Sequence, residues 1–197
     1  MLAPAFADPV RGSQRVFRSV MDAMARPGMI VVIAGLAQAP QPLGLAAAAV
    51  ALTLIDYETP VWLDPALAQS TEVAAWLRFH TGAPLADDPR QAAFGFIADP
   101  SRMPRFEAFS QGSMEYPDRA ATLVLQVERL SDNGGFWLSG PGIRGSRALS
   151  ASPLPADFAA RMRANRALFP RGLDIILASA TMVAALPRSV HVGTEQT

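Results

Sequence analysis

Apolar residues recur at helical spacing in several stretches of the chain, and each stretch predicts a helix. The first helix carries its apolar stripe on Phe17, Val20, Met21 and Met24. Residues 43–55 are apolar on every side, which is typical of a buried helix. The next helix begins at Ser70 or Thr71 and places on one stripe Val73, Trp76, Leu77 and His80. Pro155 opens a further helix near the end of the chain.

Short apolar segments between these helices predict strands. They are residues 29–34, 61–63, 93–98, 122–127, 136–139, 173–178 and 182–186. The first has no polar alternation, so we expect both of its faces to be covered. The turn sequence Asp-Asn-Gly-Gly at 132–135 predicts that 122–127 and 136–139 form a hairpin. Because helices alternate with strands, we predict one α/β domain over residues 1–197, with a mixed sheet and helices on both faces.

Composition excludes several kinds of covalent chemistry. All seventeen basic residues of the 197 are arginine, and there is no cysteine. Without a lysine amine the chain cannot hold pyridoxal phosphate covalently, form a usual P-loop, or use a lysine base. Without a thiol it can form no disulfide or Cys-ligated iron–sulfur cluster, and two histidines alone argue against a zinc site. We therefore expect no metal and no cofactor of its own.

Charge and hydropathy point to a protein that binds neither nucleic acid nor membranes. Acidic and basic residues balance at seventeen each, so no net charge attracts nucleic acid. The longest apolar segment, 43–55, is shorter than the roughly 18 residues of a spanning helix. The first nine residues lack the basic start of a secretory signal. We expect a soluble, cytoplasmic protein.

Six segments together resemble one protein family. They read FRSVMDAMARPG at 17–28, LTLIDYETPVWL at 52–63, FHTGAPL at 79–85, ATLVLQV at 121–127 with SGPGI at 139–143, FPRGLDIIL at 169–177, and ALPRSVHV at 185–192. In order and spacing they resemble the H-subunit (PhnH) family of the bacterial carbon–phosphorus lyase core complex, over essentially the whole chain. No single segment would suffice, but their common order is specific.

The resemblance implies an accessory subunit of alpha-D-ribose 1-methylphosphonate 5-triphosphate synthase. That complex transfers methylphosphonate onto the ribose of ATP and releases adenine, and its bond-making is attributed chiefly to the I subunit. The resemblance further implies a homodimer that associates with the G, I and J subunits, and a fold similar to the large domain of PLP-dependent transferases without PLP. It supplies no catalytic residues. Two alternatives remain: a stand-alone enzyme on a small phosphorylated substrate that uses His80 and Arg188, or a purely structural scaffold.

Three places in the chain are candidates for binding a phosphonate or a nucleoside triphosphate. His80, beside Thr81 at the end of its helix, has the chemistry to bind an anion or donate a proton, or is a hydrogen-bonded core histidine. Arg188 follows a strand end, where a guanidinium pairs well with phosphate; the alternative is an ion pair with Asp174 or Glu195.

The third candidate is a glycine-rich turn. Gly140 and Gly142 belong to a G-x-G-x-x-G sequence whose backbone N–H groups could cradle phosphate, although Pro141 removes one donor. A structural link is also expected, because Asp174 lies in an apolar strand and a buried carboxylate needs a partner. Arg171 or Arg188 could serve, and we assign the structural ion pair to Asp174 and Arg171.

Overall fold

The main sheet is mixed and six-stranded. The computed structural model describes residues 5–33 and 35–193, and within them the strand order is β1-β8-β7-β4-β3-β2. The strands are β1 (Val31–Val32), β2 (Val61–Leu63), β3 (Phe94–Ile97), β4 (Thr122–Gln126), β7 (Asp174–Ser179) and β8 (Met182–Leu186). Strands β2, β3, β4 and β7 are parallel, whereas β8 runs antiparallel to β7 and to β1. The predicted mixed sheet is confirmed.

A second sheet of three strands was not predicted. It has the order β6-β5-β9 and consists of β5 (Arg129–Ser139), β6 (Arg147–Ser152) and β9 (His191–Gly193). The predicted hairpin between 122–127 and 136–139 is wrong, because these segments lie in different sheets. Strand β4 is already paired with β3 and β7, and the turn sequence at 132–135 forms an irregularity within β5 instead.

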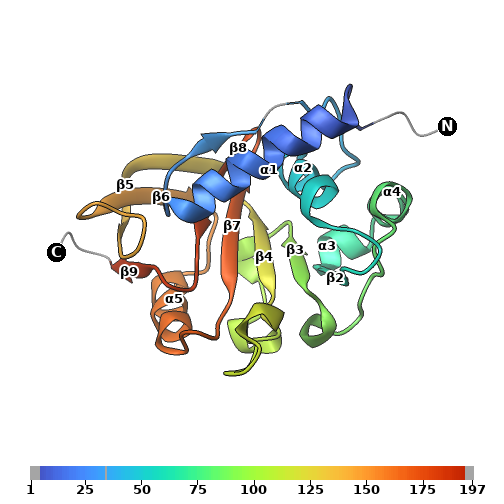
Figure 1. Ribbon diagram of the computed structural model, residues 1–197. Coiled ribbons are helices and arrows are strands. Elements are labelled where there is room, and N and C mark those ends of the chain that lie inside the picture. The colour runs from blue at the N-terminus through green and yellow to red at the C-terminus, as the bar shows by residue number, and fades with distance from the viewer. Residues whose placement is uncertain (1–4, 34, 194–197) are drawn as a thin grey trace.

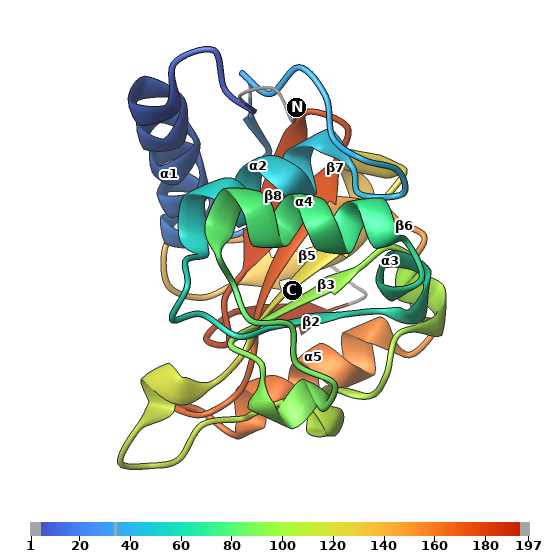
Figure 2. The ribbon, with the colours of Figure 1, turned by 90° about the vertical axis from the view of Figure 1, so that its right-hand side faces the viewer.

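Helices cover one face of the main sheet, and a helix with the small sheet covers the other (Figures 1 and 2). The first layer contains α1 (Pro9–Ala25), α2 (Leu45–Leu54), α3 (Pro65–Ala68) and α4 (Thr71–Thr81). The second contains α5 (Phe158–Ala167), and short 3-10 turns lie at Pro89–Gln91, Pro100–Arg102, Phe106–Ala108 and Pro117–Arg119. Each layer closes its own hydrophobic core against the sheet, so the predicted single α/β domain with helices on both faces is confirmed. None of these helices has the length and hydrophobicity needed to cross a membrane.

The buried face of helix α1 only partly matches the expected stripe, since Val20 is buried and Met24 packs against the core. Its buried residues are Gly12, Val16, Val20 and Ala23. Phe17 and Met21, two members of the predicted stripe, are instead 47% and 41% exposed. The first strand also differs: β1 is two residues long at the edge of the sheet, and Val32 is 63% exposed rather than covered. The structure therefore leaves apolar side chains partly exposed on both α1 and β1.

Candidate functional site

Arg188 and the expected ligand crevice lie at opposite ends of the parallel strands. In open α/β sheets, ligands bind at the carboxyl ends of the parallel strands. Because β8 is antiparallel to β7, its last residue, Leu186, pairs with Ile175 near the start of β7. Arg188 therefore lies at the amino edge of the parallel strands, opposite the edge where a ligand crevice is expected. The expectation that Arg188 borders that crevice assumed the opposite strand direction.

Arg188 forms a closed ion pair with Asp174. The Arg188 Nη2 lies 2.6 Å from Asp174 Oδ2, Nε donates to Oδ1 at 3.2 Å, and the Arg188 backbone N–H donates to the same Oδ1 at 2.8 Å. Nη1 donates to the carbonyl oxygens of Pro117 at 2.6 Å and Pro170 at 3.3 Å. The two side chains are only 15% and 16% exposed. All three guanidinium nitrogens are thus held within the chain.

The predicted pairing of Asp174 with Arg171 is wrong. Both Asp174 oxygens accept hydrogen bonds from Arg188, and Arg171 Nε is buried with no partner among the described residues. The reason is sheet geometry: β8 lies beside β7, so a residue just after β8 reaches a residue at the start of β7. The short connection between the predicted strands 173–178 and 182–186 is the sequence signal that could have placed Arg188 beside Asp174, because strands joined so closely form an antiparallel hairpin.

His80 lies in an aromatic environment at the end of α4. Its ring centroid lies 4.7 Å from that of Trp76 and 4.9 Å from that of Phe79. The Nε2 atom is buried and has no hydrogen-bond partner among the described residues. Burial holds the pKa of His80 below its usual value, so the neutral ring is favoured despite the helix C-terminus. The neighbouring Thr81 hydroxyl is occupied, since it donates to the Leu77 carbonyl at 2.7 Å and accepts from the Ala83 N–H at 3.1 Å.

The lowered pKa of His80 predicts a pH-dependent stability. Between the ordinary histidine pKa of about 6.5 and the lower value in the folded chain, the unfolded state binds a proton that the folded state rejects. The neutral His80 should therefore contribute its whole stabilising effect above about pH 6.5, and the free energy of unfolding should decrease as the pH falls through this window. Urea unfolding at pH 7.5 and 5.5 measures this, and His80→Phe should reduce the pH dependence. An equal dependence in both proteins would contradict the prediction.

The glycine turn packs against the end of α1. Gly140 and Gly142 lie between β5 and β6 with φ of 125° and 81°. A Cβ at Gly142 would lie 2.1 Å from the Ala25 carbonyl oxygen. Nearby, Arg147 Nη1 donates to the carbonyls of Arg26 at 3.2 Å and Pro27 at 3.1 Å. These contacts show that the turn and β6 fix the carboxyl end of α1.

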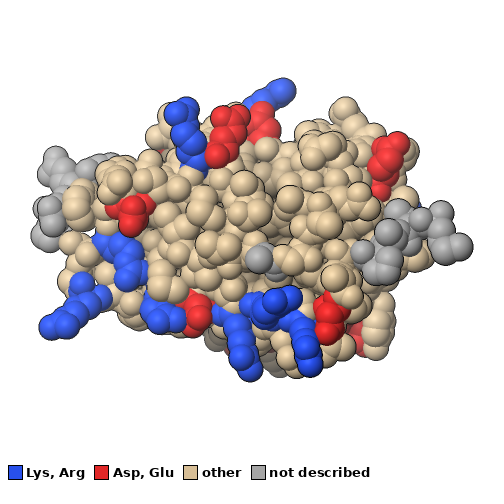
Figure 3. Space-filling model, turned by 90° about the horizontal axis from the view of Figure 1, so that it is seen from above, with Lys and Arg blue, Asp and Glu red and all other residues tan. Residues whose placement is uncertain are grey.

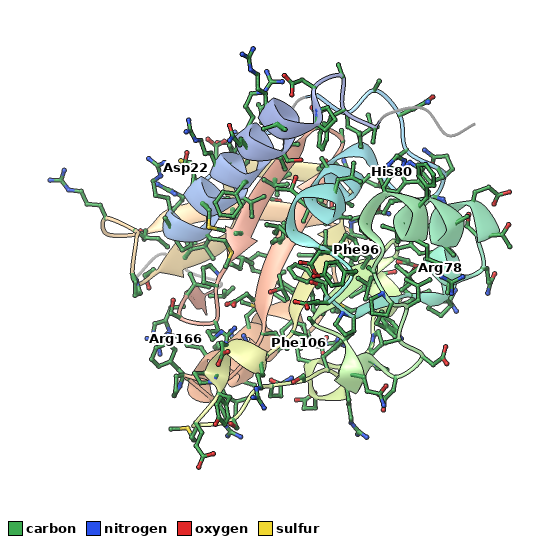
Figure 4. The ribbon with its side chains drawn as sticks, turned by 45° about the vertical axis from the view of Figure 1, so that its right-hand side comes forward. Asp22, Arg78, His80, Phe96, Phe106 and Arg166 are labelled. Carbon is green, nitrogen blue, oxygen red and sulfur yellow. The ribbon has the colours of Figure 1, made fainter. Side chains whose placement is uncertain are left out.

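The candidate ligand residues do not all converge, although Gly140 lies against Ser189, the residue after Arg188. Figure 1 places α4, which carries His80 and Thr81, at one end of the molecule and β5, β6 and β9 at the other. In Figure 4, His80 lies on one side of the buried Phe96, and Arg166 lies on the other. Arg166 Nε donates to the Ser189 carbonyl at 3.2 Å, so it marks the segment that follows Arg188. Phosphonate or triphosphate binding by His80, Thr81, Arg188, Gly140 and Gly142 stays a prediction, and it cannot involve all of them in one pocket.

At the carboxyl ends of the parallel strands, backbone N–H groups that could bind an anion already have partners within the chain. The N-terminus of α2 lies there, and helix N-termini commonly bind phosphate. In this chain the Gly44 N–H donates to Gln126 Oε1 at 2.6 Å, and the Ala46 N–H donates to the Ala180 carbonyl at 3.0 Å. Gln126 Nε2 also donates to the Pro42 carbonyl at 3.0 Å. A side chain of β4 and the β7–β8 turn thus take the donors that an anion would need.

A hollow of about 320 Å³ lies at the carboxyl ends of β2 and β3. It is lined by Asp64, Pro65, Ala66, Gln69, Asp99, Arg102, Met103 and Pro104. Asp64 is buried, and its carboxylate accepts hydrogen bonds from the backbone N–H groups of Leu67, Ala98 and Asp99. These bonds connect α3 to the end of β3. Two carboxylates beside one arginine disfavour a phosphonate here. Among the described residues, no three His, Asp or Glu side chains converge as metal ligands.

Comparison with known proteins decides the family. The family described as "Bacterial phosphonate metabolism protein (PhnH)" matches residues 4–193. The chain belongs to the PhnH family. A relative from Rhizobium meliloti (strain 1021), named alpha-D-ribose 1-methylphosphonate 5-triphosphate synthase subunit PhnH, is 45% identical over 97% of this chain and 95% of its own length. A putative C-P lyase subunit protein HtxG from Stutzerimonas stutzeri is 32% identical over 91% of this chain and 85% of its own length.

Three of the six segments that resemble PhnH proteins meet at one place in the fold. The 139–143 turn contacts the end of α1 in the 17–28 segment through Gly142 and Ala25. Gly140 lies against Ser189 and Val190 of the 185–192 segment. These family-like strings therefore build a structural junction, in which the main sheet, α1 and the small sheet are joined. Catalytic chemistry is not needed to account for their presence.

Proposed function

We propose that this chain is an accessory subunit of the carbon–phosphorus lyase core complex, alpha-D-ribose 1-methylphosphonate 5-triphosphate synthase. The observation that carries the proposal is the 45% identity to the Rhizobium meliloti PhnH subunit over nearly the full length of both chains. The similarity to a putative C-P lyase subunit supports the same assignment. In this role the chain serves phosphonate catabolism, in which the complex transfers methylphosphonate to the ribose of ATP and releases adenine.

An accessory role agrees with the side chains that the sequence provides. The chain has no lysine amine and no thiol, so it cannot hold pyridoxal phosphate or a Cys-ligated iron–sulfur cluster. The Arg188–Asp174 ion pair is largely buried, and the guanidinium is fully used in contacts within the chain. His80 lies away from it, beside Trp76 of α4. We infer that the chain works without a cofactor of its own and contributes surface and stability to the assembly.

Further parts of the proposal concern fold relatives, partners and location. We infer a fold like the large domain of PLP-dependent transferases, supported by four parallel strands extended by antiparallel β8. Cytoplasmic location, a homodimer, and association with the G, I and J subunits complete the proposal. A superposition on a PLP-dependent transferase and the solution mass of the isolated chain check the fold relationship and the dimer.

Co-expression of the complete set of core subunits, with and without this chain, tests the function. We expect the chain to co-purify with the G, I and J subunits in one assembly whose mass includes it. The assembly should form ribose 1-methylphosphonate 5-triphosphate with release of adenine, whereas the chain alone should release none. Adenine release by the isolated chain in the presence of ATP and methylphosphonate would favour a stand-alone enzyme. If the other core subunits assembled and released adenine equally well without this chain, the result would contradict the proposal.

A further inference from the structure

We propose that the solvent-facing side of α1 is a docking surface for an acidic segment of another subunit of the complex. The inference rests on the proposed function, and it adds the surface and the chemistry of the partner. The surface comprises a basic stripe (Arg11, Arg15 and Arg18) and an apolar stripe (Val10, Phe17 and Met21) on the same helix, with Val32 of β1 beside the basic stripe.

The two stripes follow from helical geometry. Positions 11, 15 and 18 are spaced i, i+4 and i+7, so their side chains line one side of the helix. Positions 10, 17 and 21 line a second side in the same way. Both stripes differ from the side that contacts the core, which holds Val16 and Val20. All six side chains belong to exposed residues.

The positive charge on this surface is poorly neutralised. Arg11 lies 3.6 Å from Asp8, and both side chains are largely exposed, so the pair is weak. Asp22, the next carboxylate along the helix, pairs with Arg26 at 2.5 Å. Arg15 and Arg18 have no carboxylate partner among the described residues. Seen from above in Figure 3, arginines form a row along the border where α1 lies.

The surface around the arginines is hollowed and partly apolar. One hollow of about 370 Å³ is lined by Asp8, Arg11, Gln14, Arg15 and Arg18. A second, of about 250 Å³, lies between the helix and β1 and includes Val32. A third, of about 310 Å³, lies between α1 and Thr53 of α2 and includes Phe17. Carboxylates can therefore meet the guanidinium groups while apolar side chains enter the flanking hollows, as in protein interfaces rich in arginine and aromatic residues.

The helix is held rigidly enough to act as a preformed site. At its start, Asp8 caps the helix, and Phe6 packs against Gly12, where a Cβ would lie 2.8 Å from the ring. At its end, Gly142 and Arg147 hold the last turn. A preformed surface loses little conformational entropy on binding. This rigidity favours recognition by the folded chain over binding that requires rearrangement.

Charge identifies the occupant. A second copy docked through the same helix would bring two sets of arginines together, and like charges across an interface oppose association. A membrane-surface helix would use its main apolar side for lipid, but in α1 that side is buried against the core. An acidic partner segment that also carries apolar side chains can pair with the basic stripe and pack against the apolar stripe.

Binding of variants to the purified remaining subunits tests the proposal. Arg15→Glu/Arg18→Glu should weaken binding by about tenfold or more at low salt, in the range of interface hot spots. Phe17→Ser/Met21→Ser should also weaken it. Raising the salt concentration should weaken binding of the wild type more than that of Arg15→Gln/Arg18→Gln. Circular dichroism should match the wild type, and thermal unfolding should show that each variant is folded at the temperature of the binding assay, because Phe17 and Met21 are 47% and 41% exposed.

Arg78→Glu/Phe79→Ser is the matched control. These neighbours are also an exposed arginine and aromatic residue on a helix, and Figure 4 shows Arg78 on α4, away from the labelled Asp22 of α1. The control should bind like the wild type. Unchanged binding by both α1 variants overturns the docking surface alone, whereas failure of the wild type to bind any subunit overturns the proposed function and the docking with it. The docking surface would also be overturned if the α1 variants lost self-association but still bound the other subunits. Binding of the wild type to anionic lipid vesicles through the same arginines would overturn it as well.

Discussion

Replacing Arg188 with alanine is expected to lower the free energy of unfolding by about 3–5 kcal/mol. The substitution leaves Asp174 without its bidentate partner in a site where the carboxylate is 16% exposed. It also removes the donor to the Pro117 and Pro170 carbonyls. Urea unfolding at pH 7 measures the loss.

Two further variants separate the ion pair from general effects of losing an arginine. Arg171→Ala removes a nearby arginine whose Nε has no partner among the described residues, and we expect it to cost no more than about 1 kcal/mol. In the Arg188→Ala background, Asp174→Ala should recover part of the lost stability, because it removes the unpaired carboxylate. Equal losses for the two arginines would show that the ion pair is not the source of the stability.

Gly142→Ala is expected to destabilise the chain by about 2–5 kcal/mol, through left-handed backbone strain and overpacking. The glycine has φ of 81°, and a Cβ would lie 2.1 Å from the Ala25 carbonyl oxygen and 2.9 Å from Pro27 Cδ. Either α1 or the β5–β6 turn must move. Hydrogen exchange should become faster in the last turn of α1, and urea unfolding gives the size of the loss.

Gly145→Ala provides the control within the same turn. Gly145 has φ of 72°, and no atom lies within 4 Å of the position that a Cβ would take. The substitution carries the backbone strain without the clash, so its expected cost is about 1–2 kcal/mol. If the two glycine variants lose the same stability, packing of the turn against α1 contributes nothing.

The fold was predictable where one local rule determined the outcome. The buried helix at 43–55 and the capped helix that begins after Ser70 appear as α2 and α4, because an all-apolar segment and a capping hydroxyl act locally. Gly82 ends α4 with φ of 70°, as expected for a C-terminal glycine. The wrong hairpin arose because 122–127 shows strand periodicity but not its partners, which come from residues far along the chain.

The buried side of α1 shows the same limit. Phe17 lies at helical spacing from Val20 and Met21, and Val16 and Ala23 lie at helical spacing from Val20, so periodicity alone could not decide which side meets the sheet. Packing decided it, because Gly12 and Ala23 admit close neighbours on the side that carries the valines. The exposed apolar stripe that results is visible only in the folded chain.

Composition alone determined what covalent chemistry this chain lacks, because no fold creates an amine or a thiol that the sequence does not contain. Local patterns also determined an α/β domain, and the ordered segments indicated the family. Only the tertiary structure decided that Asp174 pairs with Arg188, that the candidate ligand residues do not all converge, and that α1 presents arginines beside exposed apolar side chains. The physical reason is that the sequence allows each of these side chains several partners, and the packing of segments far apart in the chain selects among them.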